Sequence, residues 1–149
     1  MKGGFMLRII LVAVVGILVG CNTTDSGDKQ TIPTGTYQEI FQGADGVGTI
    51  QLQLKADGTY SGKNYVALDN GLVNCLLSEG SGNYVFVDHH IKATNKKTRD
   101  RLDCETAMSA WEDEPDSNWE VRNITNKSFE IYLEADENLP AEWIKMTKL

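Results

Sequence analysis

The chain contains few of the residues that build metal and redox sites, and little positive charge. Its 149 residues include three cysteines and two histidines, and 14 Lys and Arg stand against 21 Asp and Glu, which gives a net charge of −7. Affinity for nucleic acid comes largely from neutralising phosphates, so an acidic chain without a basic cluster is a poor candidate. We therefore expect no nucleic-acid partner.

Motifs of common enzyme classes are also missing. The sequence has neither Gly-x-Ser-x-Gly nor His-Glu-x-x-His. Its one histidine pair, in Asp88-His89-His90, is predicted to lie in a strand. Adjacent strand residues face opposite sides and cannot easily share a metal, so a hydrogen-bonded structural role is expected. The run Glu112–Asp116 lacks the spaced oxygens of a calcium loop and is predicted to be a solvated acidic loop. We expect no catalytic residue, cofactor or metal site.

Long apolar runs are absent except near the N-terminus. Ile9–Val19 carries no charge and follows Lys2 and Arg8. A membrane-spanning helix needs about 20 apolar residues, so this run is too short for one. A positive start, a short apolar middle and small residues at its end are typical of a secretory signal peptide. A core strand or helix shares that composition, but the position at the N-terminus argues against it.

The end of this run, Leu18-Val19-Gly20-Cys21, resembles the lipobox of bacterial lipoproteins. The resemblance implies that residues 1–20 are removed and that Cys21 is acylated, for example with palmitate, and two or three acyl chains give a stable membrane anchor. Asn22 stands where an Asp signals retention in the inner membrane in that family. We therefore expect a protein anchored to the cell envelope, at the outer membrane where the organism has one.

The next segment, Asn22–Thr34, is polar and is predicted to be a flexible tether. Residues 21–34 would then be the lipidated N-terminus and tether, and residues 35–149 the folded domain. Lipid rather than charge would hold this acidic domain at the membrane.

Two cysteines remain once Cys21 is acylated, namely Cys75 and Cys104. In an oxidising compartment an isolated pair favours a disulfide, worth about 3 to 4 kcal/mol on chain-entropy arguments. A metal-binding or redox pair is the alternative, but neither the close C-x-x-C spacing nor flanking histidine ligands are present. We predict a structural bridge.

Alternation of apolar and polar residues predicts an all-β domain. In Thr49–Lys55 every second residue is apolar, and Asp57-Gly58 follows as a strong hairpin signal. The other predicted strands are 35–41, 84–91, 119–124, 128–134 and 142–148, with turns at 43–48, 126–127 and 136–140. This pattern predicts an antiparallel meander that closes into a barrel of about eight strands, with room for one short helix.

Two segments stay open on sequence alone. Residues 70–82 fit either a strand or an ordered loop clipped by Cys75. In residues 95–118, Cys104, Met108 and Trp111 follow helical spacing, while Leu102, Cys104, Thr106 and Met108 alternate as in a strand.

The order of strand and turn motifs resembles small bacterial lipocalin-like lipoproteins. The motifs are Gly35-Thr36-Tyr37, the Gly46–Tyr60 hairpin, Gly82-x-Tyr84, Trp119 and Trp143–Met146. The first half is also similar to the N-terminal barrel of a copper- and surface-stress envelope lipoprotein. Members of that family carry Cys-Ala-Asp-Cys where this chain has Gly43-Ala44-Asp45-Gly46. This resemblance implies an envelope-stress or metal-response lipoprotein as an alternative function, although both cysteines are absent here.

A lipocalin-like barrel implies an interior that is filled with side chains or holds one small ligand. The inward-facing set is expected to be Ile50, Leu52, Leu54, Phe129, Ile131 and Leu133. Tyr60, Phe86 and Trp119 are the candidate ligand-binding residues in an apolar pocket, and packing of the core is the alternative role for each. The sequence thus favours a non-enzymatic module that binds a small apolar ligand or another envelope component.

A second function remains possible. Ser61-Gly62-Lys63-Asn64-Tyr65 resembles the S-G-x-x-Y loop of inhibitors of C-type lysozyme, which are small, often lipid-anchored barrels. That resemblance implies that Ser61 and Tyr65 contact the lysozyme. An ordinary hairpin arm with Tyr65 packed down is the alternative.

Overall fold

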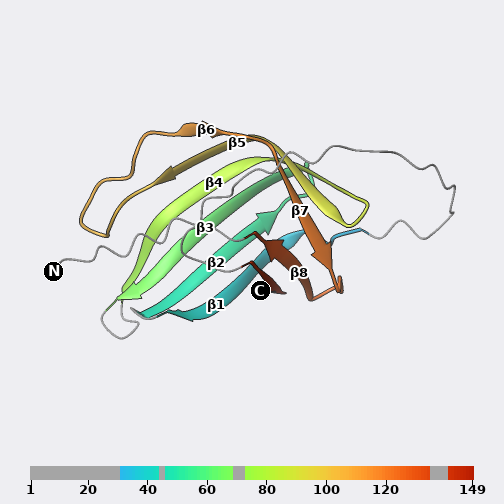
Figure 1. Ribbon diagram of the computed structural model, residues 1–149, viewed down its shortest axis with the longest axis horizontal. Helices are drawn as coiled ribbons and strands as arrows, with labels where there is room; N and C mark the ends of the chain where they lie inside the picture. Colours follow the sequence, from blue (N-terminus) through green and yellow to red (C-terminus); the bar gives the residue numbers. More distant parts are fainter. Residues whose placement is uncertain (1–30, 44–45, 69–72, 135–140) are drawn as a thin grey trace, which may run out of the picture.

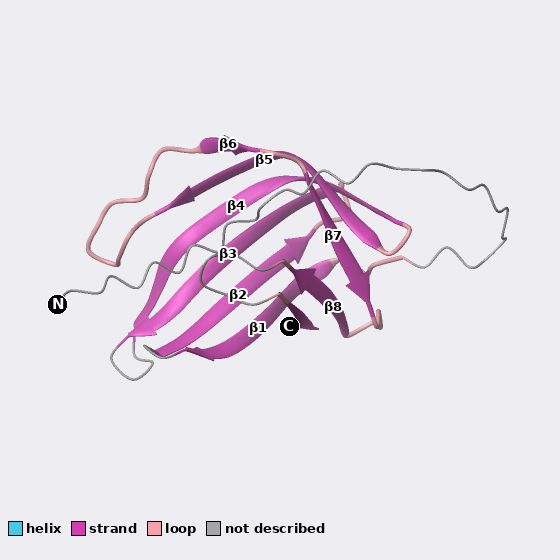
Figure 2. Ribbon diagram, viewed as in Figure 1, coloured by secondary structure: helices cyan, strands magenta, loops and turns pink. Residues whose placement is uncertain are grey.

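The structure is a computed structural model that describes residues 31–43, 46–68, 73–134 and 141–149. Within these ranges every regular element is a strand, as Figure 2 shows. The strands are β1 (Gly35–Gly43), β2 (Gly46–Leu54), β3 (Thr59–Leu68), β4 (Val73–Val87), β5 (His90–Asp100), β6 (Glu112–Glu114), β7 (Ser117–Arg122), β8 (Ser128–Leu133) and β9 (Glu142–Lys148). None of the described segments forms a helix of the length and apolar character needed to cross a membrane.

The strands close into an eight-stranded antiparallel barrel (Figure 1). Strands β1 to β5 pair in chain order, β5 then pairs with β7, and β7, β8 and β9 continue the sheet. The ring closes where β9 returns to β1, with Tyr37 opposite Lys148. The extra strand, β6, pairs with the far end of β5. The predicted all-β barrel is confirmed, whereas the short helix is not found among the described residues.

The predicted first hairpin is confirmed and its geometry follows from its residues. Leu52 and Leu54 are buried in β2, while Gln53 between them is exposed. At the turn, Gly58 adopts a φ of 80°, a left-handed conformation that glycine takes without a steric penalty. Asp57 stabilises the turn, because its Oδ1 accepts hydrogen bonds from the backbone N–H and the hydroxyl of Thr59 at 2.9 and 2.6 Å.

The prediction of one strand over residues 84–91 was wrong. The chain turns at Asp88 and His89, whose φ angles of 51° and 59° give a two-residue hairpin with Val87 opposite His90. Asp tolerates this left-handed conformation, which is why the turn forms without a glycine. His89 therefore lies in a turn and not in a strand, and the His90 Nδ1 lies 2.6 Å from the Asp88 carbonyl oxygen.

The structure decides both open segments. Cys75 lies within β4, so the described part of 70–82 is strand. Residues 101–111 form a loop that follows neither the helical nor the strand pattern. The acidic run 112–116 is not simply a solvated loop, because Glu112–Glu114 is a strand paired with β5 and Asp113 lies 3.6 Å from the Lys97 ammonium.

The remaining predicted turns have different outcomes. The turn at 126–127 is present between β7 and β8, where the Thr125 N–H donates to the Ser128 carbonyl at 2.8 Å. The turn predicted at 43–48 is narrower, since β1 and β2 pair as far as Gly43 and Gly46. Residues 44–45 and the turn predicted at 136–140 lie outside the described residues.

The two ends of the barrel are packed differently. One end, here called the base, contains the start of β1 and the turns at 55–58 and 88–89, and the opposite end, the mouth, contains the 101–111 loop and β6 (Figure 1). Buried apolar side chains fill the base: Ile32, Tyr37, Leu54, Tyr60, Ile91, Ala93, Val121, Phe129 and Met146. Ile32 precedes β1, and the Tyr37 hydroxyl donates to the Pro33 carbonyl at 2.5 Å, so the chain packs against the base as it enters the barrel.

A disulfide attaches the 101–111 loop to the barrel wall. The predicted bond between Cys75 and Cys104 is present, with the two Cα atoms 5.8 Å apart. Next to it, Arg101 Nε donates to the Leu76 carbonyl oxygen at 2.6 Å. The two ends of the loop are joined where it leaves β5, because the Ser109 N–H donates to the Asp100 carbonyl at 2.6 Å. These contacts fix one side of the mouth to β4.

Removing this disulfide should destabilise the protein. Replacing Cys75 and Cys104 together with Ser is expected to lower the free energy of unfolding by about 3 kcal/mol, because the bond restricts the unfolded chain. Urea unfolding of the double variant and of the wild type measures the difference. Equal stabilities, or an equal response of both proteins to a reducing agent, would show that the bond contributes nothing to the fold.

Candidate functional site

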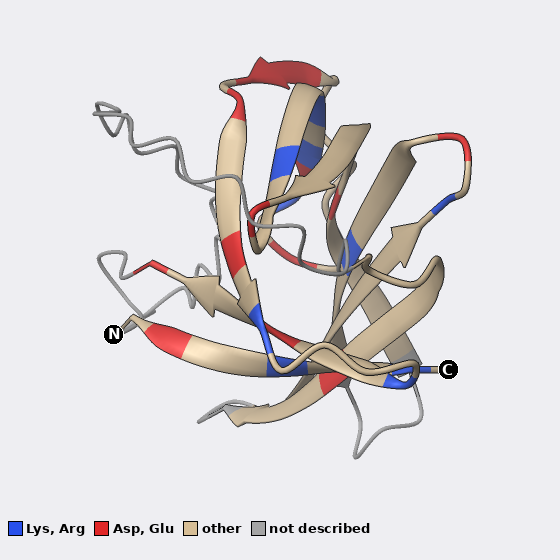
Figure 3. Ribbon diagram, turned by 90° about the vertical axis from the view of Figure 1, so that its right-hand side faces the viewer, with Lys and Arg blue, Asp and Glu red and all other residues tan. Residues whose placement is uncertain are grey.

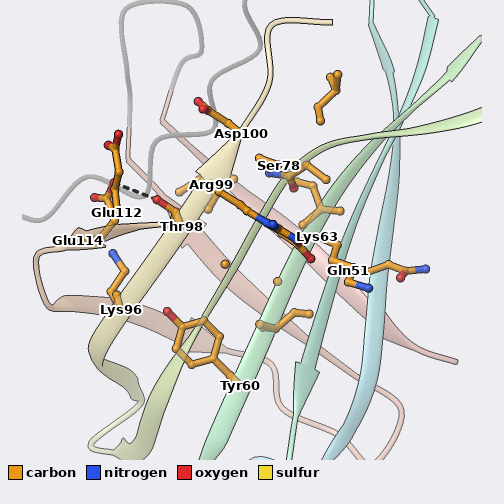
Figure 4. A pocket seen from close by; sticks show the side chains of 18 of the residues that line it. Gln51, Tyr60, Lys63, Ser78, Lys96, Thr98, Arg99, Asp100, Glu112 and Glu114 are labelled. Atoms are coloured by element: carbon orange, nitrogen blue, oxygen red, sulfur yellow. Dashed lines mark hydrogen bonds and ion pairs between the residues drawn. The ribbon is translucent and has the colours of Figure 1, made fainter. Parts of the chain in front are cut away.

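A cavity of about 310 Å³ lies inside the barrel between the packed base and the mouth (Figure 4). Each of the strands β2 to β9 contributes residues to its wall, whereas the described residues of β1 do not line it. The wall also includes Leu102, which is 62% exposed, and the exposed Glu112. Because exposed residues line the same space as buried ones, the cavity is continuous with solvent at the mouth.

Two glycines side by side explain why this part of the barrel is hollow. The pairing of β2 to β5 places Leu52, Gly62, Gly80 and Thr98 in one row across the sheet. Leu52 is buried and all four line the cavity, so the row faces inward. At the two middle positions the wall has no side chain, and the interior volume that side chains fill in a small barrel stays empty there.

The wall is mainly apolar on one side of the barrel and mainly polar on the other. The apolar side is formed by β2, β7, β8 and β9, with Ile50, Leu52, Trp119, Ile131, Leu133, Ile144 and Met146. Most of the polar side chains come from β3 to β6. One row above the glycines, Asn64 and Ser78 face inward, and the Asn64 amide donates to the Ser78 hydroxyl at 2.7 Å. The site therefore suits a molecule with an apolar body and a polar end.

A β-bulge turns Lys96 into the barrel. Opposite Ser81–Asn83 the pairing of β4 and β5 slips, and Asn95 adopts a φ of 51°. The extra residue reverses the alternation of β5, so Lys96 faces inward as Ala93 does, and Lys97 faces solvent. Lys96 is 2% exposed and lines the cavity.

Polar and aromatic groups surround the Lys96 ammonium. It donates to the Ser117 hydroxyl at 2.6 Å and lies 5.9 Å from the centre of the Trp119 ring. Glu114 is paired with Lys96 across the sheet, and Figure 4 shows both on one side of the pocket with Tyr60 below them. Burial lowers the pKa of Lys96, and the carboxylates of Glu114 and Asp116 partly oppose this effect. Burial, with a smaller contribution from Glu114, raises the pKa of Tyr60.

The structure brings two of the three predicted ligand-binding residues together. Tyr60 and Trp119 line the cavity, and their rings meet edge to face with centres 5.7 Å apart. Phe86 lies opposite Ile91 next to the turn at the base and packs against the core there. Of the expected inward-facing set, Ile50, Leu52, Ile131 and Leu133 line the cavity, while Leu54 and Phe129 are buried in the base.

The S-G-x-x-Y segment does not lie in a loop. Side chains alternate between the two faces of β3, and Ser61 and Tyr65 are on the face opposite to Gly62. They therefore lie on the outer face of the barrel. The Ser61 hydroxyl is 3.4 Å from the Gln53 side-chain oxygen on the neighbouring strand. Cys21 lies outside the described residues. Among the described residues no group of three or more His, Cys, Asp and Glu is arranged to hold a metal ion.

Sequence reasoning missed Gly62, Gly80 and Lys96. Glycine inside a strand often marks a place where another group approaches closely, so Gly62 and Gly80 carried a usable signal. Lys96 carried none, because its inward orientation depends on the bulge at Asn95.

Comparison with known proteins gives no relative to this chain: no family model, no curated protein and no solved structure matches it. The site must therefore be interpreted from its own residues.

The buried lysine should make stability depend on pH. In the folded protein the pKa of Lys96 lies below 10.5, the ordinary value that it takes in the unfolded chain. At a pH between the folded and the unfolded pKa, the Lys96 amine therefore holds more protons in the unfolded chain. Stability therefore rises with pH across that range. Lys96→Met lacks this contribution, so the free energy of unfolding of the wild type should increase relative to that of Lys96→Met as pH rises toward 10.5. Urea unfolding at a series of pH values measures this, with the solvent-facing Lys97→Met as control. Parallel curves for wild type and Lys96→Met would contradict the burial of a titrating amine.

Proposed function

We propose that this protein is a non-enzymatic binding module of the cell envelope, and that its barrel holds a small, largely apolar molecule. The observation that supports this most directly is the cavity of about 310 Å³ behind Gly62 and Gly80. Ligand sites for small molecules begin at about 300 Å³, so the space suits a small ligand. A side chain at Gly62, where a Cβ would make only an ordinary contact at 3.8 Å, would help to fill this space, and the chain has none there.

The wall indicates what kind of molecule fits. Burial of apolar surface contributes about 25 cal/mol per Å², so the apolar side chains around Ile131 and Met146 favour a hydrocarbon body. Asn64, Ser78 and Lys96 lie on β3 to β5, on the polar side of the wall, and offer hydrogen bonds to one polar end. An amphipathic molecule with its hydrocarbon body against the apolar side would match this arrangement.

The proposed membrane anchor is compatible with this geometry. If Cys21 carries acyl chains, they join the barrel through the segment that packs against the base at Ile32. The mouth lies at the end of the barrel opposite Ile32. We propose the outer membrane as the site of anchoring because Asn22 follows Cys21.

Refilling the cavity should abolish ligand binding. A Cβ added at Gly62 would lie 3.8 Å from its nearest neighbour, the Gln51 carbonyl oxygen, which is an ordinary contact. Gly62→Leu should therefore fold and place its side chain in the cavity. We expect the neutral dye N-phenylnaphthylamine, whose fluorescence rises in apolar surroundings, to bind the wild type and to bind Gly62→Leu at least about tenfold more weakly, a loss of about 1.4 kcal/mol.

Ser61→Leu is the matched control, because it places the same side chain on the outer face of the same strand. It should bind the dye as the wild type does. Equal binding by the wild type and Gly62→Leu, with both proteins folded by circular dichroism, would show that the dye does not enter the barrel and would contradict the proposed function.

Lipid attachment can be tested separately. In a bacterial host, Cys21→Ala should abolish incorporation of radiolabelled palmitate and move the protein from the membrane to the soluble fraction, since Cys21 is the proposed acylated residue. Thr23→Ala, two positions away, should leave both measurements unchanged. Palmitate incorporation that persists in Cys21→Ala would place the anchor elsewhere.

A further inference from the structure

The cavity has a buried amine in its wall, and this feature identifies a ligand chemistry. Lys96 is the one charged side chain of the cavity wall that is nearly fully buried, at 2% exposed, among the described residues. We propose that the cavity binds an aldehyde or ketone with an apolar body, and that Lys96 holds it as an imine. This inference rests on the proposed binding function and specifies its ligand.

Lys96 lies where the polar end of a bound molecule would be. Its ammonium is 5.9 Å from the centre of the Trp119 ring, at the border of the apolar part of the wall. The Ser117 hydroxyl, at 2.6 Å, holds the amine in place. A molecule whose hydrocarbon body contacts Trp119 and Ile131 would bring a terminal carbonyl carbon near the amine nitrogen.

Charge at the mouth does not select an ionic ligand. Among the described residues of the cavity wall, four are basic and four are acidic: Lys63, Lys96, Arg99 and Arg101, and Glu79, Asp100, Glu112 and Glu114. Arg99 Nε donates to Glu79 at 2.7 Å, and Arg101 donates to the carbonyl of Leu76. Glu112 and Glu114 would repel a free carboxylate ligand at the mouth, and the wall as a whole has no net formal charge that would attract a cation. A neutral carbonyl compound needs no opposite charge in the wall.

The surroundings of Lys96 also favour the reaction. An amine must be neutral to attack, and burial of a lysine favours its neutral form. Nζ would attack the carbonyl carbon and form a C–N bond, giving a carbinolamine. Its C–O bond then breaks, and the oxygen leaves as water with the two hydrogens that the neutral amine carried. Glu114, opposite Lys96 in the neighbouring strand, is placed to carry these protons from nitrogen to oxygen.

Reductive trapping tests the proposal directly. The mature wild-type protein is incubated with octanal and sodium cyanoborohydride, which reduces an imine to a stable secondary amine. Intact-mass measurement and peptide mapping should find one octyl group, at Lys96. Lys97→Arg should be labelled like the wild type, because Lys97 faces solvent. Lys96→Arg keeps the positive charge but cannot form this imine, so its labelling should fall at least about tenfold. Octanol, which has no carbonyl group, should reduce labelling of the wild type by competing for the cavity.

Each outcome decides between specific possibilities. If the wild type were labelled on exposed lysines and not on Lys96, the proposal of an imine at Lys96 would be wrong. This result does not depend on whether Lys96→Arg folds, because it is measured on the wild type. In that case, displacement of N-phenylnaphthylamine by octanol would show that the cavity still binds neutral apolar molecules and that the proposed function stands. Failure of the dye to bind would count against the proposed function itself.

Discussion

Closure of the barrel is the constraint on which the other features depend. Eight strands enclose a fixed interior, which inward-facing side chains either fill or leave open. At the base, Tyr37 and Phe129 meet with ring centres 4.8 Å apart and exclude solvent. One level higher, the adjacent glycines at 62 and 80 remove two side chains from the same wall. The fold thus obtains its stability at one end and its empty space at the other.

A bulge in β5 places the amine of Lys96 in the wall of this cavity. A perfectly alternating β5 would place Lys97 inside and Lys96 outside, and the bulge at Asn95 reverses this. The slip also needs Gly82, because a Cβ there would lie 2.7 Å from the Thr94 carbonyl oxygen. Beyond the bulge, β5 continues past β7 and pairs with β6, which brings the acidic β6 beside the basic part of β5 (Figure 3). The bulge therefore sets the buried amine, and the extension of β5 past β7 sets the carboxylates beside it.

The sequence predicted those features whose signals are local. Alternation in 49–55, the Asp57-Gly58 turn and the isolated cysteine pair each led to the correct element. The turn at Asp88-His89 was missed because it lacks the glycine that normally marks a two-residue hairpin. Tyr60 and Trp119 were found because aromatic residues in a barrel are candidates for any pocket. The glycine row and Lys96 depend on which residues of distant strands become neighbours, and this register is not readable from one segment alone.

The buried lysine is the feature that packing alone explains least. Transfer of a lysine ammonium from water into a protein interior is costly, and replacement of a buried ionic group by an apolar one is often neutral or stabilising. The barrel already packs Ile91 and Ala93 on the same strand, so an apolar residue at position 96 would extend its core. Instead the chain keeps Lys96 and surrounds it with Ser117 and Glu114. Departures from the rules of packing concentrate at functional sites. A cavity, two glycines and a buried amine in one wall are most simply explained together, as parts of one binding site.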